Sequence, residues 1–446
     1  MKFKKLGAVL GALSMSAVIA LSCSACGGNG GGTLGEIDYT GEITVWWPGS
    51  TAEMEAINEA KKDYVALHPD VKISVIGQST ADFYSAYMLA CSGKSAPNIA
   101  YIDHVFVQTL AYYGYIADLT EGYSDLESTF LSSLWEPGFY GDSLYALPMS
   151  ANTLATVYNK TLIARAQNTT TDNITLPKNY EELTALAKQI EALNNEETKN
   201  DPYYALTIPA GTAHDSMATM SYLSYVNRCG GTGILSDDLK TSLLTSDACV
   251  DAAQKISELG KYSPATFSEA KFENGKIAFI EMGPWKIRDY EKYSAQYGWE
   301  VGYSTALPFT EGGNIDATIG LYSLVVTKNA NTQNNQAALA ADFAKFITTN
   351  DKYQLSFSKA NNLLPTTKTA LEDEYYTSDV WKVFVEQVKH AAVRPGSPVW
   401  TDIEETIGDF VTRLVQQKVT GADAVRQSCV AIHGSISDAI AEVYED

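Results

Sequence analysis

A large aromatic side chain follows an abrupt strand end beyond the middle of the chain. Residues 277–280 have the pattern of a short buried strand, Gly283 and Pro284 end it, and Trp285 follows the break. The flat face of a Trp ring is suited to stacking on a ligand, and ligands of open α/β sheets bind outside the carboxyl ends of the strands. Two interpretations stay open here. Trp285 lines a cleft, or it covers the apolar edge of a domain.

The sequence lacks the motifs of the common catalytic sites. It contains no His-Glu-x-x-His, no Gly-x-Ser-x-Gly and no phosphate-binding glycine loop with its Lys. The five His residues stand at scattered positions that match no metal-ligand spacing. Carboxylates are plentiful, but no pair is singled out as the acid and base of a glycosidase. We therefore expect a binding protein without a metal or cofactor, and an enzyme is the alternative.

The composition argues against several classes of partner. The chain has 446 residues, 45% of them hydrophobic, which is enough for two domains with sizeable cores. Its formal net charge is −21 at neutral pH. Such an acidic chain repels nucleic-acid phosphates and anionic lipid head groups, so neither is expected as a partner.

Residues 1–25 have the features of a signal peptide. A basic start is followed by an apolar stretch over residues 6–21, which is short for a membrane span. The small residues before Cys26 and the glycine-rich tether over residues 26–35 resemble a bacterial lipoprotein cleavage site. This resemblance implies that Cys26 carries the lipid. Cys23 is the alternative, because a Cys three positions before the cleavage Cys departs from the usual aliphatic residue.

The first hundred residues of the expected mature chain alternate between strand and helix patterns. Strand-like segments at 42–47, 71–76 and 98–102 are separated by helical segments at 51–67 and 82–90. This βαβαβ order predicts a parallel sheet with right-handed crossovers. The three strands then end at one rim of the sheet.

The later segments give a mixed strand and helix pattern. Cys429 lies on an apolar helical stripe with four aliphatic residues, which predicts a core position. A disulfide between Cys229 and Cys249 stays open, because sequence spacing does not define the geometry. Further strands are expected at 144–148, 154–160, 203–208, 301–308 and 320–326, with helices at 130–135 and 337–347.

Several short sequence motifs along the chain resemble those of the bacterial extracellular solute-binding proteins for carbohydrates, the family of maltose-binding protein. The signature phrase is residues 275–279 followed by residues 283–285, and similar phrases at 144–148, 154–160 and 362–365 occur in the expected order. The departures from the family pattern are single-residue ones. The resemblance implies an α/β, two-lobe periplasmic-binding-protein-like fold with a three-crossing hinge and a ligand cleft between the lobes.

The resemblance also implies how the chain is divided and what it does. Lobe one would comprise residues 36–118 and 303–349, and lobe two residues 119–302 and 350–446. A monomer, lipid-anchored on the outer face of a bacterial cytoplasmic membrane, would deliver a mono- or oligosaccharide to ABC-importer permease subunits. The alternatives are a surface-anchored carbohydrate-active enzyme and a same-fold receptor for a non-sugar solute. The lack of a basic cluster at the expected cleft argues against an anionic solute.

The candidate ligand-binding residues lie at strand ends and at positions matched to the family. Aromatic faces stack on the C–H side of a pyranose, and planar polar groups bind its hydroxyls. Adjacent strand residues face opposite ways, and the resemblance makes Trp46 the inward residue and Trp47 the exposed one. The stacking set is Trp47, Tyr101, Trp285, Tyr322 and Trp400, and the polar set is Ser50, Thr51, Gln78, Asp103, His104, Asn152, His214, Glu281 and Arg394.

Alternatives remain for individual members of this set. Ser50 is equally suited to capping the helix that follows it, and Arg394 to a structural ion pair. Trp400 stands where the family often has a second stacking aromatic, which favours a place in the site. Ser50-Thr51 and His104-Val105 replace charged pairs of maltose-binding protein, so maltose itself is not implied.

Overall fold

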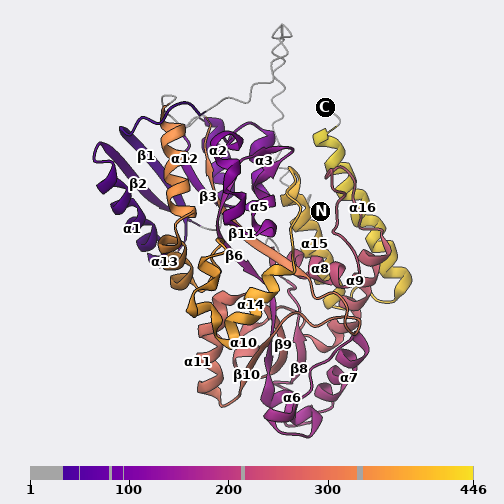
Figure 1. Ribbon diagram of the computed structural model, residues 1–446. Coiled ribbons are helices and arrows are strands. Elements are labelled where there is room, and N and C mark those ends of the chain that lie inside the picture. Colours follow the sequence, from indigo (N-terminus) through magenta and orange to yellow (C-terminus); the bar gives the residue numbers. More distant parts are fainter. Residues whose placement is uncertain are drawn as a thin grey trace, which may run out of the picture. The chain divides into compact units, whose positions relative to one another are not determined.

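The computed structural model describes residues 34–49, 51–79, 83–93, 95–211, 216–328 and 335–444, and Thr33–Asp446 forms one compact unit (Figure 1). The signal peptide and both candidate lipidation residues, Cys23 and Cys26, lie outside the described residues, as do Ser50, His214 and the side chain of Thr51. None of the described helices is long and apolar enough to cross a lipid bilayer.

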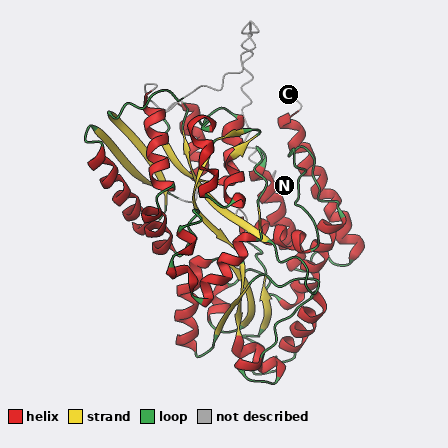
Figure 2. Cartoon of the chain, viewed as in Figure 1, coloured by secondary structure: helices red, strands yellow, loops and turns green. Residues whose placement is uncertain are grey.

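The larger sheet has six strands and begins with the expected βαβαβ unit (Figure 2). β1 (Gly41–Pro48) lies between β2 (Val71–Gln78) and β3 (Ile99–Asp103) and runs parallel to both, which confirms the predicted parallel arrangement. Three later strands extend this sheet. β11 (Ala317–Val326) runs antiparallel to β3, and β6 (Ala146–Thr153) runs antiparallel to β11. The third, β12 (Ala391–Ala392), runs parallel to β11.

Helices cover both faces of the six-stranded sheet. α1 (Thr51–Leu67), α12 (Asn335–Thr348) and α13 (Asp351–Asn361) pack on one face. α2 (Phe83–Gly93) and α3 (Val107–Tyr112) pack on the other face. Both faces are apolar for this reason, and the strand ends are left as the place for polar side chains.

The two adjacent tryptophans of β1 are oriented opposite to the prediction. Ile43, Val45 and Trp47 alternate along the strand toward the face that α1 and α12 cover, and Trp47 is 0% exposed. Trp46 points to the other face and is half-buried against α2 and α3. The prediction of an exposed Trp47 is therefore wrong, because the alternation that buries Ile43 and Val45 also buries the third member of the series.

The smaller sheet has four strands in the order β10-β7-β9-β8. β7 (Ala155–Asn159) runs antiparallel to both β9 (Ile277–Met282) and β10 (Val301–Ser304). β8 (Tyr204–Thr207) runs parallel to β9. The predicted strand at 301–308 therefore ends four residues early, at Ser304. The apolar residues that follow it, Ala306 and Leu307, are buried in loop structure instead.

Helices surround the four-stranded sheet and confirm the predicted apolar stripes. Cys429 is buried in the last helix together with its aliphatic neighbours. The four cysteines of the described chain are free thiols, so the Cys229–Cys249 disulfide is not formed. The helices are α6 (Lys160–Gln167), α7 (Tyr180–Glu191), α8 (Ser216–Arg228), α9 (Asp247–Leu259), α10 (Glu269–Glu273), α11 (Ile287–Tyr297), α15 (Trp400–Val415) and α16 (Ala422–Tyr444).

Connections of different length link the two sheets. β6 of the larger sheet and β7 of the smaller one are separated by a single residue, Leu154. The chain returns from β10 to β11 through residues 305–316, and Thr153 Oγ1 donates to Thr318 O at 3.2 Å beside this return. The lobe boundaries stay a prediction. The prediction assigns α13 to lobe two, whereas α13 lies against α1 of lobe one through the Lys352–Glu59 ion pair at 3.1 Å.

The remaining helices and strands complete the described fold. The predicted helix at 130–135 begins only at Ser132 and is one turn long, because Phe130 pairs with Thr367 in an isolated β-bridge instead. These elements are α4 (Thr120–Tyr123), α5 (Ser132–Trp135), α14 (Asp379–Lys389), β4 (Phe139–Tyr140), β5 (Ser143–Leu144) and β12 (Ala391–Ala392).

Candidate functional site

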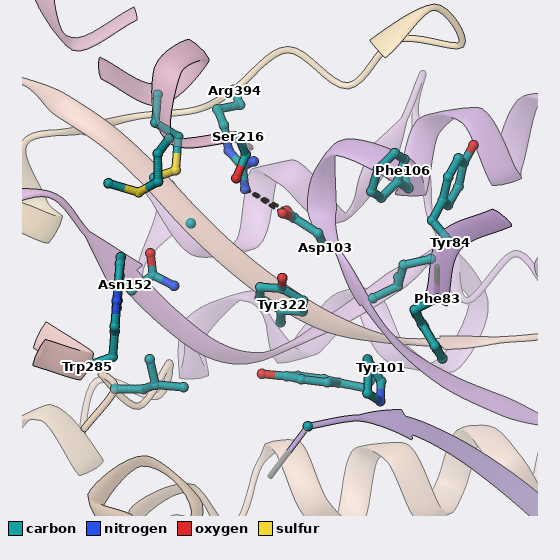
Figure 3. Close-up of a pocket in the computed structure, with 17 residues that line it drawn as sticks. Phe83, Tyr84, Tyr101, Asp103, Phe106, Asn152, Ser216, Trp285, Tyr322 and Arg394 are labelled. Carbon is teal, nitrogen blue, oxygen red and sulfur yellow. Dashed lines mark hydrogen bonds and ion pairs between the residues drawn. The ribbon is translucent and has the colours of Figure 1, made fainter. Parts of the chain in front are cut away.

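A cavity of about 730 Å³ lies where strands of the six-stranded sheet end and where Trp285 follows β9 (Figure 3). This volume is within the range of small-molecule sites, roughly 300–1,000 Å³. Aromatic, amide, hydroxyl and thioether side chains make up most of its wall. The charged residues of the described wall are Asp103 and Arg394. The cavity therefore combines stacking surfaces with few, isolated polar groups.

Two tyrosine rings on adjacent strands form one side of the cavity. Tyr101 of β3 and Tyr322 of β11 have ring centroids 5.0 Å apart. Trp47 stacks on Tyr101 at 4.0 Å, with an angle of 3° between the ring planes. The Tyr101 hydroxyl lies 2.6 Å from Ser150 Oγ, in a hydrogen bond where either atom is the donor. Trp47 thus supports the cavity wall from the core and offers no ring of its own to a ligand.

Trp285 lies on the opposite side of the cavity from Phe83, Tyr84 and Phe106 (Figure 3). Its position depends on Gly283, because a Cβ there would lie 1.7 Å from Cζ3 of the Trp285 ring. The ring therefore folds back over the Gly283 backbone. It is half-buried, and it also packs at the edge of the apolar clusters beneath β9. Trp285 lines the cavity and contacts the core at once.

Asp103 and Arg394 form a buried ion pair in the cavity wall. Nη2 of Arg394 lies 2.7 and 2.8 Å from the two carboxylate oxygens of Asp103, and Nε donates to Ile319 O at 3.1 Å. Burial alone raises the pKa of Asp103, but Arg394 and His104 outweigh this and hold the pKa well below its ordinary value. Nη1 of Arg394 is buried and has no hydrogen-bond partner among the described residues.

The remaining polar groups of the wall come from β6 and from the start of α8. Asn152 lies opposite Gly320, where a Cβ would come within 2.2 Å of Asn152 Oδ1. Gly320 therefore leaves room for the amide to lie over β11 and face the cavity. Ser216 opens α8 and adds a hydroxyl, and Met217 and Met220 follow it with flexible thioether side chains.

Besides Trp47, four described members of the predicted site set lie outside this wall. Gln78 ends β2 without reaching the cavity, and His104 is buried behind Asp103. Glu281 is held by Arg228 at 2.7 Å, beside a separate interior space of about 30 Å³. Trp400 is 1% exposed, because it begins α15 inside the cluster shared with α8 and α9. This burial contradicts the prediction that Trp400 offers a stacking face.

Sequence reasoning missed the aromatic end of the cavity and its methionines. Phe83 and Ser216 open helices that follow strand ends, and Phe106 lies three residues beyond the end of β3. Tyr84 stacks on Phe106 with ring centroids 3.6 Å apart. Phe83, Tyr84, Phe106 and Ser216 share a signal that the sequence offers. Each stands within a few residues of a strand end or at the start of the helix that follows a strand, which is the rim where ligands of such sheets bind.

A family described as "Bacterial extracellular solute-binding protein" matches residues 56–382 of the chain. The diacetylchitobiose binding protein DasA of Streptomyces coelicolor is 25% identical over 442 residues, which cover 95% of this chain and 96% of that protein. The maltotriose-binding protein of Pyrococcus abyssi is 22% identical over 385 residues, covering 83% of this chain and 78% of that protein.

Solved structures are similar over nearly the whole chain. The cyclic α-maltosyl-1,6-maltose binding protein of Arthrobacter globiformis gives a TM-score of 0.74 at 22% identity, covering 90% of this chain and 100% of that one. The GacH receptor of Streptomyces glaucescens gives 0.70 at 22% identity, covering 91% and 99%. This likeness confirms the predicted fold class.

Proposed function

Because the chain belongs to the family of bacterial extracellular solute-binding proteins, we propose that it captures a neutral mono- or oligosaccharide for an ABC importer. Family membership also confirms the prediction of a binding protein and not an enzyme. The observation that carries the proposal is the cavity wall. Trp285 and Tyr322 present partly exposed rings to the cavity, and the buried ring of Tyr101 packs against Tyr322. Separate polar groups line the same cavity (Figure 3).

The charges of the wall support a neutral ligand. Asp103 and Arg394 neutralise each other at 2.7 Å, so neither a cation nor an anion finds an uncompensated partner on the described wall. The amide of Asn152 and the hydroxyl of Ser216 line the cavity and are suited to sugar hydroxyls. The relatives point the same way, since their names include maltotriose, galactooligosaccharide and diacetylchitobiose.

Capture would close the protein around its ligand. Trp285 follows the four-stranded sheet, whereas Tyr101 and Tyr322 belong to the six-stranded one, so a sugar between these rings contacts both sheets. With lobes divided as the family resemblance implies, such a ligand favours the closed arrangement over the open one. The importer would then select the closed form.

The anchor is a separate part of the proposal. A lipid on Cys26, with Cys23 as the alternative, would keep the protein at the outer face of the cytoplasmic membrane. Cys26→Ala should leave the protein unprocessed or released, as cell fractionation would show. If the Cys26→Ala protein stays in the membrane fraction after a high-salt wash, Cys26 is not the anchor.

Calorimetric titration with neutral oligosaccharides tests the function. The panel would contain maltotriose, N,N′-diacetylchitobiose, galactotriose, cellotriose and xylotriose, with spermidine and phosphate as charged solutes. We expect binding heat with at least one sugar. Heat with a charged solute alone contradicts the proposal, and release of shorter sugars during incubation supports the enzyme instead.

Two tryptophan variants separate binding from folding in the same experiment. Trp285→Ala should lose about one to two decades of affinity while the melting temperature changes little, because a cavity-wall ring leaves no closed void. Trp47→Ala is the matched control, since its ring is fully buried, and it should lose about 3–5 kcal/mol of stability. A large fall in melting temperature for Trp285→Ala, with affinity unchanged, would make Trp285 a packing residue.

A further inference from the structure

Three buried hydroxyl side chains meet where the two sheets are joined, and we call them the hydroxyl cluster. Thr153 is the last residue of β6, Thr318 is the second residue of β11, and Ser224 lies in α8. Each of the three is 0% exposed. Thr153 precedes the single residue that leads to β7, and Thr318 follows the return from β10. The cluster therefore lies at two of the connections between the sheets.

Hydrogen bonds join the cluster to one carbonyl of α8. Thr318 Oγ1 donates to Met220 O at 2.7 Å, and Ser224 Oγ donates to the same oxygen at 2.9 Å. Ser224 Oγ accepts from Thr318 N at 3.0 Å and lies 3.0 Å from Thr318 Oγ1. Thr153 Oγ1 donates to Thr318 O at 3.2 Å. The larger sheet therefore holds α8 at Met220 through hydroxyl groups.

The carbonyl that the cluster holds belongs to a residue of the cavity wall. Met220 lines the cavity, and so does Gly320, which stands two residues after Thr318 on the same face of β11. Asn152, the neighbour of Thr153 in β6, lines it as well. The cluster thus sets the spacing between the part of the wall that α8 supplies and the part that β6 and β11 supply.

The apolar contacts around the cluster define this spacing less sharply. They come from a small group that consists of Leu154, Met220, Ala306 and Ala317. Met217 and Trp285, which both line the cavity, pack at the edge of this group. Met side chains are flexible and fill gaps in more than one conformation. A hydrogen bond requires a particular distance and direction, so the hydroxyls fix what the thioethers leave adjustable.

We propose that Thr318 is a positioning residue for the cavity, because its hydroxyl holds the first turns of α8 at the distance from β11 that a bound sugar requires. Thr318 is not among the described residues of the cavity wall, so it acts through Met220 and without touching the ligand. This inference rests on the proposed function, since it assigns Thr318 a role in the affinity of the same cavity. The alternative is a purely structural role, in which Thr318 stabilises the fold and leaves binding unaffected.

Thr318→Val tests this role, because it removes the hydroxyl and keeps a β-branched side chain of similar size. Calorimetric titration well below the melting temperature, with a neutral sugar that binds the wild type, would measure its affinity. We expect the affinity to fall about three- to tenfold, the effect of losing one buried hydrogen bond that holds the wall. Thr318→Ser keeps the hydroxyl and should restore most of the affinity.

Ser257→Ala is the matched control for the loss of a buried hydroxyl. Ser257 of α9 is buried, its Oγ donates to Val419 O at 2.9 Å, and it lies outside the described cavity wall. Both Ser257→Ala and Thr318→Val should lower the melting temperature, whereas only Thr318→Val should lower the affinity. Ser224→Ala should also lower the affinity. Combined with Thr318→Val it should lose less than the sum of the two, because both hydroxyls hold one carbonyl.

Three results would overturn the positioning role. The first is unchanged affinity in Thr318→Val with a lowered melting temperature, which makes Thr318 purely structural and leaves the proposed function intact. The second is an equal loss of affinity in Thr318→Ser and Thr318→Val, because the hydroxyl would then not be the cause. The third is an equal loss in Ser257→Ala, which would mean that lower stability alone weakens binding. Absence of heat with every sugar in the wild type would refute the proposed function, and the positioning role with it.

Discussion

His104 is held in one protonation state by its buried surroundings. Its Nδ1 lies 3.1 Å from Leu321 O and 3.0 Å from Asp103 Oδ1, and both neighbours are acceptors. Nδ1 therefore carries the hydrogen, while Nε2 has no partner among the described residues. Burial lowers the pKa of His104, and the nearby Arg394 guanidinium opposes protonation, although Asp103 favours it. The neutral ring is the form that the fold selects.

This lowered pKa predicts a loss of stability in mild acid. Below pH 6.5, the ordinary His value, the unfolded chain binds a proton at His104 more readily than the folded chain does. The free energy of unfolding should therefore fall as the pH falls from 6.5 toward 5, by at most about 1.4 kcal/mol per pH unit. Chemical denaturation at several pH values would measure the slope.

The control for this prediction is His104→Asn, whose amide nitrogen replaces Nδ1 as the donor. Between pH 6.5 and 5 the free energy of unfolding should fall less steeply in His104→Asn than in the wild type, because the variant lacks this one titrating ring and keeps the other histidines. The Asp103 carboxylate contributes at lower pH. Because its pKa is lowered by folding, it stabilises the fold at pH values above 3.8, its ordinary pKa, and this contribution is lost as the pH falls through the folded pKa. Parallel curves for wild type and His104→Asn would contradict the assignment.

At the scale of elements, the end of β9 illustrates how one glycine positions a ring. Gly283 has φ −85° and ψ 170°, a backbone conformation open to any residue, so an Ala there meets no backbone strain. Its Cβ meets the Trp285 ring instead, at 1.7 Å. Gly283→Ala should therefore displace the ring and lower sugar affinity about tenfold with Trp285 still present.

A glycine in open space is the matched control for Gly283. Gly434 lies inside α16, and a Cβ added to it would meet no atom within 4 Å beyond the neighbouring backbone of its own helix. Gly434→Ala should leave affinity unchanged and stabilise the protein by about 0.5–1 kcal/mol, through helix propensity. Calorimetric titration and thermal melts of both variants would check this. Unchanged affinity in Gly283→Ala would mean that the ring position does not matter for binding.

Elements with a regular apolar period could be predicted from the sequence, whereas their pairing across the chain could not. The βαβαβ unit and the stripe around Cys429 are local patterns, and the structure confirms both. The pairing of β6 with β11 joins residues far apart in sequence, with no local signal. The burial of Trp400 could not be predicted either, because α8 and α9, which are distant in the sequence, cover its ring. Trp285 could be placed, since its glycine and proline mark the break locally.

At the scale of the whole molecule, ligand binding should draw the two sheets together. The connections that join the sheets include the single residue Leu154 and the loop of residues 305–316. A bound sugar that touches Trp285 and Tyr322 should favour a closed arrangement, because the two rings belong to different sheets. Small-angle scattering should show a smaller radius of gyration when the sugar that binds is added in excess.

The same excess of ligand should raise the melting temperature. A ligand that binds only the folded protein adds about 2.7 kcal/mol of stability at one hundred times its Kd. Trp285→Ala is the control, and at the same sugar concentration it should show a smaller change in both measurements. A radius that stays constant while the melting temperature rises would mean that the sugar binds without closure.

The distribution of tryptophans makes the protein an optical reporter of its own occupancy. The chain has seven tryptophans, and five of them, Trp47, Trp135, Trp299, Trp381 and Trp400, are buried away from solvent. Trp46 packs on α2 and α3, whereas Trp285 is the one on the described cavity wall. A ligand that displaces water from Trp285 therefore changes the emission of one indole against a constant background. Binding can be followed by intrinsic fluorescence, with no dye or label attached.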